Sequence, residues 1–338
     1  MWILNFRKFG NAFLCTILLL GVSPVALAEW VGNAEGEIRY DSNINNAKSA
    51  NDIASGSSLS AGASATGFFP LENGNSLSIS GESRGETFNN YTGLNNLSLG
   101  AALAFRKKWA LGPYAPWTGL SLSSAHLNFA NNIRNGWRNQ IVIRGGKRVF
   151  ERWDVRAEYM IERRTADTLP SVQPGISGDV FSQASRAMTL NAEYTWSDSL
   201  FLTFGSLLRH GDVVASTREV TNTISSPTYP TYPTYPSYPS VTSAISNLPS
   251  SQAIAMDTVF GQNFYAYRMT GTTYGLNVDM NIAMTPSSLL RISVSRLVTR
   301  AEGDNNYAKN VAMLSWNYNF PRLSKSGHDV RSSEGVGY

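Results

Sequence analysis

The sequence predicts an all-β fold, namely a single up-and-down antiparallel β-barrel of about 12 strands that crosses a membrane. Stretches in which apolar and polar side chains alternate recur along the chain, as expected of strands with lipid on one face and a polar interior on the other. The connections between these stretches alternate between long and short. Beyond residue 28, no stretch approaches the ~20 consecutive apolar residues that a membrane-spanning helix requires.

The first 28 residues have the pattern of a secretory signal peptide. Arg7 and Lys8 precede an apolar run from Ala12 to Val22, and Ala26-Leu27-Ala28 supplies the small residues that a signal peptidase requires. We therefore expect residues 1–28 to be removed and the mature chain to begin at Glu29. A single uncleaved membrane anchor is the alternative, but the apolar run is short and is interrupted by a glycine.

The composition excludes several kinds of chemistry. The one cysteine, Cys15, lies inside the predicted signal peptide, so we expect neither disulfides nor thiolate metal ligands in the mature chain. The net charge of +4 includes Arg7 and Lys8, and the small remaining excess is not the basic footprint of a nucleic-acid-binding protein. We predict no cofactor, no metal site and no nucleic-acid partner.

The clearest strand pattern lies between Trp153 and Arg164. Its odd-numbered positions are mostly apolar and its even-numbered positions mostly carry Asp, Arg or Glu, a face that a soluble β-sandwich would rarely bury. Met188 to Trp196 and Tyr274 to Ile282 repeat this pattern. Further copies complete the predicted set, at residues 30–40, 59–69, 76–84, 97–105, 114–124, 137–145, 200–208, 290–298 and 312–320.

The lengths of the connections predict the topology. The polar segments that follow the odd-numbered strands are long, at residues 41–52, 85–95, 126–135, 165–185, 210–263 and 299–306. Those that follow the even-numbered strands are short, at residues 70–75, 107–113, 146–152, 197–199 and 285–288. Membrane barrels have long loops outside and tight turns on the periplasmic side, so we expect both ends of the barrel domain on the periplasmic side.

The last predicted strand resembles the final-strand signal of bacterial outer-membrane barrels. The strand ends on an aromatic residue, and Ala312, Leu314, Trp316, Tyr318 and Phe320 alternate with Met313, Ser315, Asn317 and Asn319. The resemblance implies insertion into the outer membrane by the barrel assembly machinery, with membrane lipid as the surrounding partner. In those families the aromatic residue is usually the last of the chain. Here a polar tail, residues 321–338, follows the predicted barrel domain of residues 29–320, and we expect it to be a disordered periplasmic extension.

A second resemblance is local. The segment from Glu37 to Ala47, with the sequence EIRYDSNINNA, resembles the opening strand and loop of the barrel domains of surface lipoprotein assembly modifiers and related export porins. Those proteins carry helical repeats ahead of the barrel, and this sequence shows none. Their cargo function is therefore not transferred to this chain.

The polar positions that alternate with the apolar ones on each strand face the interior of the predicted barrel, and they supply candidate pore-lining residues. Two consecutive strands place Arg138, Arg144, Arg156 and Arg164 on this face, which suggests a track for anionic or sugar solutes because guanidinium groups bind carboxylates through paired hydrogen bonds. Strand count and arginine lining resemble those of 12-stranded porins for acidic oligosaccharides. The alternative is a stopper of salt bridges that closes the lumen. The predicted pore-lining residues are Arg39, Arg84, Arg138, Arg144, Arg156, Glu158, Glu162, Arg164, Glu193, Arg209, Asp279 and Arg291.

The longest loop contains a low-complexity repeat from Thr228 to Pro239, in which proline occurs at every third position. Such spacing favours an extended polyproline II rod with tyrosines along one edge. The rod is either an arm that contacts a surface ligand, such as a sugar or another protein, or a solvated spacer. A third alternative is that it folds inward and narrows the pore.

Three classes of function follow from a barrel of this kind. The first is a passive outer-membrane channel for small hydrophilic solutes, with anionic or sugar solutes as candidates, and this is the function that we predict. The second is a non-conducting structural or adhesive barrel that acts through its loops. The third is an outer-membrane phospholipase, because Ser124 and His126 share a strand face, but their order does not match that family's motif and we predict no enzyme.

Overall fold

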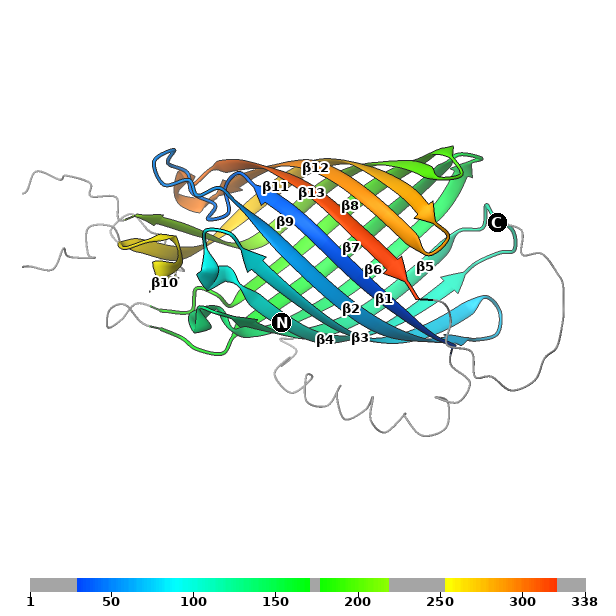
Figure 1. Ribbon diagram of the computed structural model, residues 1–338, viewed down its shortest axis with the longest axis horizontal. Helices are drawn as coiled ribbons and strands as arrows, with labels where there is room; N and C mark the ends of the chain where they lie inside the picture. The colour runs from blue at the N-terminus through cyan, green and yellow to red at the C-terminus, as the bar shows by residue number, and fades with distance from the viewer. Residues whose placement is uncertain (1–28, 171–176, 219–252, 321–338) are drawn as a thin grey trace, which may run out of the picture.

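The computed structural model describes residues 29–170, 177–218 and 253–320. Twelve long antiparallel strands form a closed ring, in which each strand pairs with its neighbours in the sequence and the pairings of β1 with β13 and of β9 with β11 complete the circle. Figure 1 shows the strands inclined to the long axis of the barrel. This architecture confirms the predicted fold class. The predicted signal peptide (1–28), the tyrosine-proline repeat (228–239) and the polar tail (321–338) lie outside the described residues.

The strands are 13 to 22 residues long in the barrel. Their bounds are β1 Glu29–Asp41, β2 Gly56–Pro70, β3 Asn75–Phe88, β4 Asn96–Lys108, β5 Trp117–Phe129, β6 Gly136–Phe150, β7 Trp153–Ala166, β8 Gln183–Ser197, β9 Leu200–Arg218, β11 Phe264–Thr285, β12 Ser288–Ala301 and β13 Tyr307–Asn319. The short strand β10 (Ala253–Met256) pairs only with β11. Among the described residues, four single-turn helices lie in the loops: η2 Thr92–Leu94, η3 Asn132–Arg134, η4 Thr258–Phe260 and η5 Glu302–Asp304.

Most of the connections separate by length, as predicted; the exception is 109–116, which is longer than three of the connections at the opposite end. One end of the barrel, here called the turn end, carries the connections 71–74, 109–116, 151–152, 198–199 and 286–287. The opposite end, the loop end, carries 42–55, 89–95, 130–135, 167–182, 219–263 and 302–306. β1 begins and β13 ends at the turn end. In membrane barrels of this topology the short turns are periplasmic, which assigns the loop end to the cell exterior.

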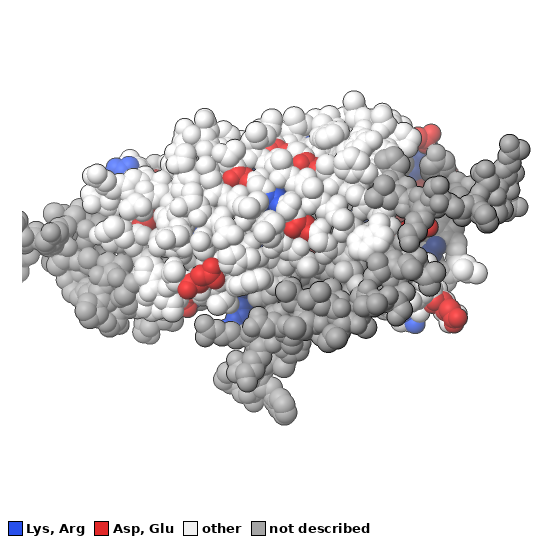
Figure 2. Space-filling view, turned by 60° about the horizontal axis from the view of Figure 1, so that its bottom comes forward, with Lys and Arg blue, Asp and Glu red and all other residues white. Residues whose placement is uncertain are grey.

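The outer surface of the barrel is apolar where lipid would surround it. On β7, Val155, Tyr159 and Ile161 point outward and are 40–45% exposed, whereas Glu158 and Glu162 on the opposite face are less exposed and point inward. The face that Figure 2 presents is mostly uncharged, with isolated charged side chains. Leaving such a surface in water would be costly, and lipid removes that cost. No helix in the described ranges is long and apolar enough to span a membrane.

The hairpin of β9 and β11 corrects one prediction. The registered pairs run from Phe264 with Arg218 to Ile282 with Leu200. β9 therefore continues to Arg218, inside the region predicted to be the loop 210–263, and β11 begins at Phe264, before the strand predicted from Tyr274. The extension was missed because its side chains do not alternate between lipid and lumen. Loop segments cover it instead, and Val213, Ala215 and Met269 are all buried there.

Candidate functional site

Several inward-facing charges of the barrel wall are paired with charges on the adjacent strand or on the next strand but one. Arg84 of β3 donates hydrogen bonds to Glu35 and Glu37 of β1 at 2.7 and 2.8 Å. Arg156 of β7 lies 3.3 Å from Glu193 of β8. The predicted stopper would require such pairs to fill the lumen, but the side chains of Arg156 and Glu193 remain 51% and 23% exposed. The ion pairs therefore follow the wall and leave space beside them.

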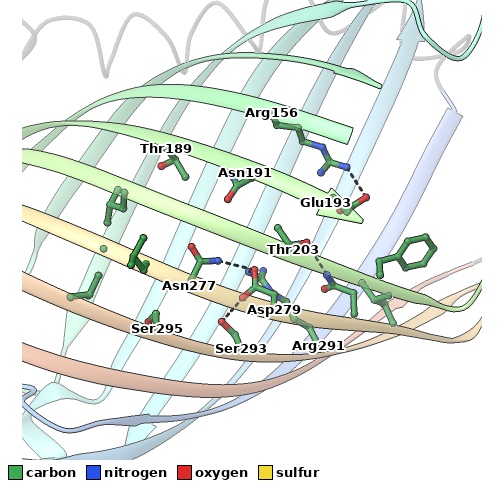
Figure 3. Close-up of a pocket in the computed structure, with 17 residues that line it drawn as sticks. Arg156, Thr189, Asn191, Glu193, Thr203, Asn277, Asp279, Arg291, Ser293 and Ser295 are labelled. Atoms are coloured by element: carbon green, nitrogen blue, oxygen red, sulfur yellow. Dashed lines mark hydrogen bonds and ion pairs between the residues drawn. The ribbon is translucent and has the colours of Figure 1, made fainter. Parts of the chain in front are cut away.

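That space is a cavity of about 740 Å³ beside β8, β9, β11 and β12. Figure 3 shows Asp279 at its centre, where the carboxylate accepts hydrogen bonds from Asn277 at 3.0 Å, Arg291 at 2.7 Å and Ser293 at 2.5 Å. Each cation in the lining has a carboxylate partner, and the remaining polar groups are amides and hydroxyls. The middle of the lumen is therefore polar and electrically balanced.

Gly205 of β9 makes this cavity possible. A Cβ atom at that position would lie 2.1 Å from Oδ1 of Asn277 and 2.6 Å from Oδ1 of Asn191, far inside an ordinary contact of about 3.4 Å. The amides of the two neighbouring strands therefore lean over the glycine. Only a residue without a side chain lets β8, β9 and β11 present both amides at this level.

A second cavity, of about 340 Å³, lies beneath the loops at the loop end. Its lining comes from β7, β8, β9, β11, β12, β13 and several loops, so loops share the lumen with the wall at this level, which is here called the constriction. Four cations line it, namely Arg134, Arg164, Arg209 and Lys309. Asp257 pairs with Arg134 at 2.5 Å, and Asp41 pairs with Lys309 at 3.1 Å.

The other two cations of this cavity lack carboxylate partners in the described part of the chain. Arg209 donates to the carbonyl oxygen of Asp212 at 2.9 Å, and Arg164 donates to the carbonyl oxygen of Arg134. Burial of Arg134, in the loop between β5 and β6, lowers the pKa of its guanidinium, while Asp257 opposes that shift. The constriction therefore carries a net positive charge.

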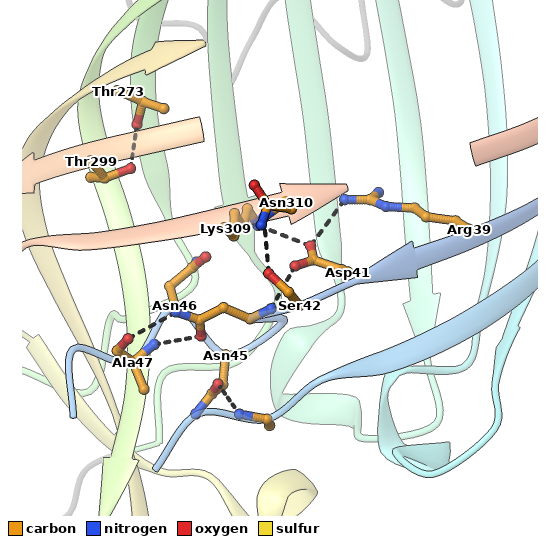
Figure 4. Close-up of polar contacts among 12 residues, drawn as sticks. Arg39, Asp41, Ser42, Asn45, Asn46, Ala47, Thr273, Thr299, Lys309 and Asn310 are labelled. Carbon is orange, nitrogen blue, oxygen red and sulfur yellow. Dashed lines mark hydrogen bonds and ion pairs between the residues drawn. The ribbon is translucent and has the colours of Figure 1, made fainter. Parts of the chain in front are cut away.

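The loop between β1 and β2 folds over the mouth of the barrel. Asn45 is 3% exposed, and its Nδ2 donates to the carbonyl oxygens of Ser216 on β9 and of Asp52, both at 2.7 Å. The backbone amide of Ser216 donates in return to the carbonyl oxygen of Asn45 at 2.8 Å. β1 and β9 are separated in the ring by β11, β12 and β13, so this contact joins strands that are not neighbours. Figure 4 shows the turn that holds this loop and the adjacent contacts of Asp41 with Arg39 and Lys309.

Two further loop segments complete the cover. Val180 and Phe181 are 0% and 1% exposed and pack against alanines of β10 and β11. The guanidinium of Arg134 stacks over the ring of Phe181, 4.5 Å from its centroid. Ser216 also donates to Asp257, which precedes η4, at 2.5 Å. A small apolar cluster and a buried ion pair thus fix the loops to one another.

The structure divides the predicted pore-lining residues between the two levels. Arg144, 3.8 Å from Glu158, and Arg156 lie in the lower lumen, whereas Arg164 lies under the loops. Arg138 is registered opposite Arg164 on the same face. The four arginines therefore do not form one continuous unpaired track. The other predicted residues also lie on the inward-facing side of their strands. Arg39 and Arg84 form ion pairs, with Asp41 and Glu35, and Glu162 accepts a hydrogen bond from Gln140. Arg209 lines the cavity at the loop end, and Glu193, Asp279 and Arg291 line the cavity of about 740 Å³.

The sequence interpretation missed Asn45, Arg134, Phe181 and Asp257 as constriction residues. All four lie in predicted loops, where no periodicity indicates which side chains turn inward. A partial signal was available for Asn45, because the motif Asn43-Ile44-Asn45-Asn46 is rich in side chains that form hydrogen bonds with the backbone of turns.

Ser124 and His126 do not form a catalytic pair in the described structure. Nε2 of His126 lies 2.9 Å from Oδ2 of Asp167, and its ring contacts the edge of Trp137. Within the described ranges, no hydrogen bond joins His126 to Ser124. The same part of the chain contains no group of three or more His, Cys, Asp or Glu side chains that could hold a metal ion.

Comparison with known proteins agrees with the fold. No family model and no curated protein matches the chain. An outer-membrane channel from Pseudomonas putida F1 is 12% identical with a TM-score of 0.50, and the match covers 86% of this chain and 96% of that one. The translocator domain of the autotransporter NalP from Neisseria meningitidis is 8% identical with a TM-score of 0.39, with coverage of 92% and 98%. An anion-selective porin from Comamonas acidovorans is 7% identical with a TM-score of 0.37, with coverage of 87% and 99%. By its closed ring, its apolar exterior and its segregated loops, the chain has the fold of the bacterial outer-membrane β-barrel proteins.

Proposed function

We propose that this protein is a passive outer-membrane channel for small hydrophilic solutes and that it favours anionic ones, including acidic sugars. The observation that carries the proposal is the cavity at the loop end, where Arg164 and Arg209 add two positive charges that form no ion pair with a described carboxylate. A narrow, cationic level acts on every solute that passes, because an ion there loses part of its hydration and interacts strongly with nearby charges.

The middle cavity supports the second half of the proposal. Its amides and hydroxyls, among them Asn191, Asn277 and Ser295, can donate and accept hydrogen bonds with a solute rich in hydroxyl groups. Its charges are balanced, so it does not discriminate strongly by the sign of the solute. The two levels would therefore act in series, with charge selection under the loops and accommodation of polar groups below.

The test is the reversal potential of purified protein in planar bilayers under a salt gradient, with Arg209→Glu compared with wild type. Two unit charges ~6 Å apart interact by about 0.7 kcal/mol in water and by about 3 kcal/mol at an effective dielectric constant of about 20. A change of two charge units at the constriction should therefore lower the ratio of anion to cation permeability by at least about tenfold.

A matched control is the double variant Arg144→Glu and Arg156→Glu. These residues lie in the lumen nearer the turn end and are paired with Glu158 and Glu193, so we expect a smaller shift in selectivity than that of Arg209→Glu alone. If the double variant inverts selectivity and Arg209→Glu leaves it unchanged, the constriction does not select ions by charge. That result would support the arginine track predicted from the sequence instead.

The loop contacts favour a second candidate, a barrel that does not conduct and acts through its surface. The bonds of Asn45 with β9 and the packing of Phe181 both cover the mouth. Single-channel recording separates the two: steps of conductance and swelling of liposomes in small sugars support the channel, and silence in both assays supports the structural or adhesive barrel. The Thr228 to Pro239 loop is then the segment to delete in assays of surface binding.

We propose in addition that residues 1–28 are removed on export and that β13, with Phe320 after it, carries the signal read by the barrel assembly machinery. N-terminal sequencing of the outer-membrane protein should begin at Glu29. Substitution of Phe320 by alanine should lower the amount of barrel inserted in cells.

A further inference from the structure

Basic side chains gather on the outer surface of the barrel near the loop end, on the side of β7 to β12. Arg163 of β7, Arg186 of β8, His210 of β9 and Arg300 of β12 are all exposed. Their parity is that of the lipid-facing residues: Arg163 follows Ile161, and Arg300 follows Val298, at spacings of two. They therefore point away from the lumen, and the channel function does not use them.

The strand register joins most of these residues into one row. Arg186 is paired with His210, His210 with Thr272, and Thr272 with Arg300, across four consecutive strands. In the other direction the same row continues to Ile161 and Ile141, which are apolar. Because the strands are inclined to the barrel axis, a row of paired residues crosses the membrane obliquely (Figure 1). The change from isoleucine to arginine marks the point where the row leaves the hydrocarbon.

The next outward-facing row toward the turn end is apolar along its whole length. Its members are Tyr159, Met188, Leu208, Tyr274 and Val298, which are 38–50% exposed. A charged side chain on the lipid face is strongly unfavourable at the bilayer centre and nearly neutral in free energy close to an interface. The basic row therefore lies at the boundary of the outer leaflet, immediately above an apolar surface suited to acyl chains.

The arginines of this surface have no partner among the described residues. Across residues 29–170, 177–218 and 253–320, the side chains of Arg163, Arg186 and Arg300 form no hydrogen bond or ion pair. The two carboxylates nearest in sequence to the row are engaged elsewhere: Asp212 accepts from the amide of Ala184 at 2.8 Å, and Glu302 accepts from the amide of Thr270 at 3.4 Å. Three guanidinium groups without an ion-pair partner at a lipid boundary can bind an anionic headgroup.

We propose that this surface binds the phosphate groups of lipid A, the anchor of lipopolysaccharide in the outer leaflet. The loop end faces the cell exterior, where a lipid of this kind presents two phosphates just above a set of saturated acyl chains. Arginine binds phosphate through two parallel hydrogen bonds, and the apolar row beneath the arginines matches the position of the chains. One lipid would span β8 to β12, with Arg163 at the edge of its headgroup.

The test uses the mature protein folded in detergent micelles and titrated with diphosphoryl lipid A, with binding followed by native mass spectrometry. The triple variant Arg163→Gln, Arg186→Gln and Arg300→Gln should bind at least about tenfold more weakly, since each basic residue near an anionic membrane surface contributes measurably to binding. The control is Lys147→Gln. Lys147 is an exposed, outward-facing cation at the turn end, and its removal should leave lipid A binding unchanged.

Three results would overturn the proposal. The first is equal affinity of the wild type and the triple variant, provided that heat-dependent gel mobility shows both to be folded barrels. The second is equal loss of binding in Lys147→Gln. The third is equal affinity of the wild type for phosphatidylglycerol and lipid A, which would indicate general attraction to anionic lipid instead of a site matched to two phosphates. A lipid A stripped of its phosphates should bind as weakly to the wild type as diphosphoryl lipid A binds to the triple variant.

Discussion

The contact of Asn45 with β9 allows a direct test of whether the loops restrict the pore. In Asn45→Ala, three hydrogen bonds of the buried amide are lost, to the carbonyls of Ser216 and Asp52 at 2.7 Å and from the amide of Ala54 at 2.8 Å. Each bond of this kind contributes about 0.5–1.5 kcal/mol, so the docked loop should lose about 1.5–4.5 kcal/mol. The population of undocked loop should therefore rise by about 10- to 1,000-fold.

Two measurements report on undocking. Lys48 lies in the same loop, so trypsin should cleave after it faster in Asn45→Ala than in the wild type when the protein is held in liposomes. Single-channel recordings should show higher or more frequent conductance, because the cavity beneath the loop opens to the outside. Cleavage reports on the loop alone, and conductance reports on what the loop covers.

The control for this experiment is Asn135→Ala. Asn135 accepts a hydrogen bond from the amide of Phe129 at 2.7 Å, but that contact stays within the single connection between β5 and β6. Its loss should leave both cleavage at Lys48 and conductance near the wild-type values. Unchanged cleavage and conductance in Asn45→Ala would refute the reasoning that this loop is fixed across the mouth by its asparagine.

Two further predictions concern the middle of the lumen. In Gly205→Ala, the new methyl group would collide with the amides of Asn191 and Asn277, so we expect the free energy of unfolding to fall by roughly 1–3 kcal/mol. The loss should appear as a lower temperature for the heat-induced shift in gel mobility. The control is Gly81→Ala, which should unfold at the wild-type temperature because nothing lies within 4 Å of the new methyl group. In Asp279→Asn, Arg291 loses its carboxylate while the hydrogen-bonding geometry is largely kept, so the reversal potential should move toward greater anion preference; a move toward cations would contradict the pairing of Asp279 with Arg291.

Much of the barrel follows from local sequence. On β7, the alternation of Val155, Tyr159 and Ile161 with charged residues predicts which face meets lipid, since a strand places successive side chains on opposite sides. Loop lengths predict which end carries the turns, and the structure agrees. The arginines predicted to line the pore lie on the inward parity for the same reason.

The pairing state of those arginines depends on register, which the sequence does not reveal. Arg84 reaches Glu35 and Glu37 because β1, β2 and β3 are aligned so that the three residues converge, and a shift of two residues would leave the same faces inward with different partners. The extension of β9 to Arg218 was likewise missed, because protein and not lipid covers its faces.

The sequence by itself determined a closed barrel of about 12 strands and which face of each strand is apolar, because a membrane imposes a period of two on every spanning strand. Tertiary structure alone decided where the lumen is narrow and which charges remain unpaired there. Both depend on contacts between segments far apart in the chain, such as Asn45 with Ser216 and Arg134 with Asp257. These residues lie in loops or at strand ends, where no repeating sequence pattern indicates which side chains meet.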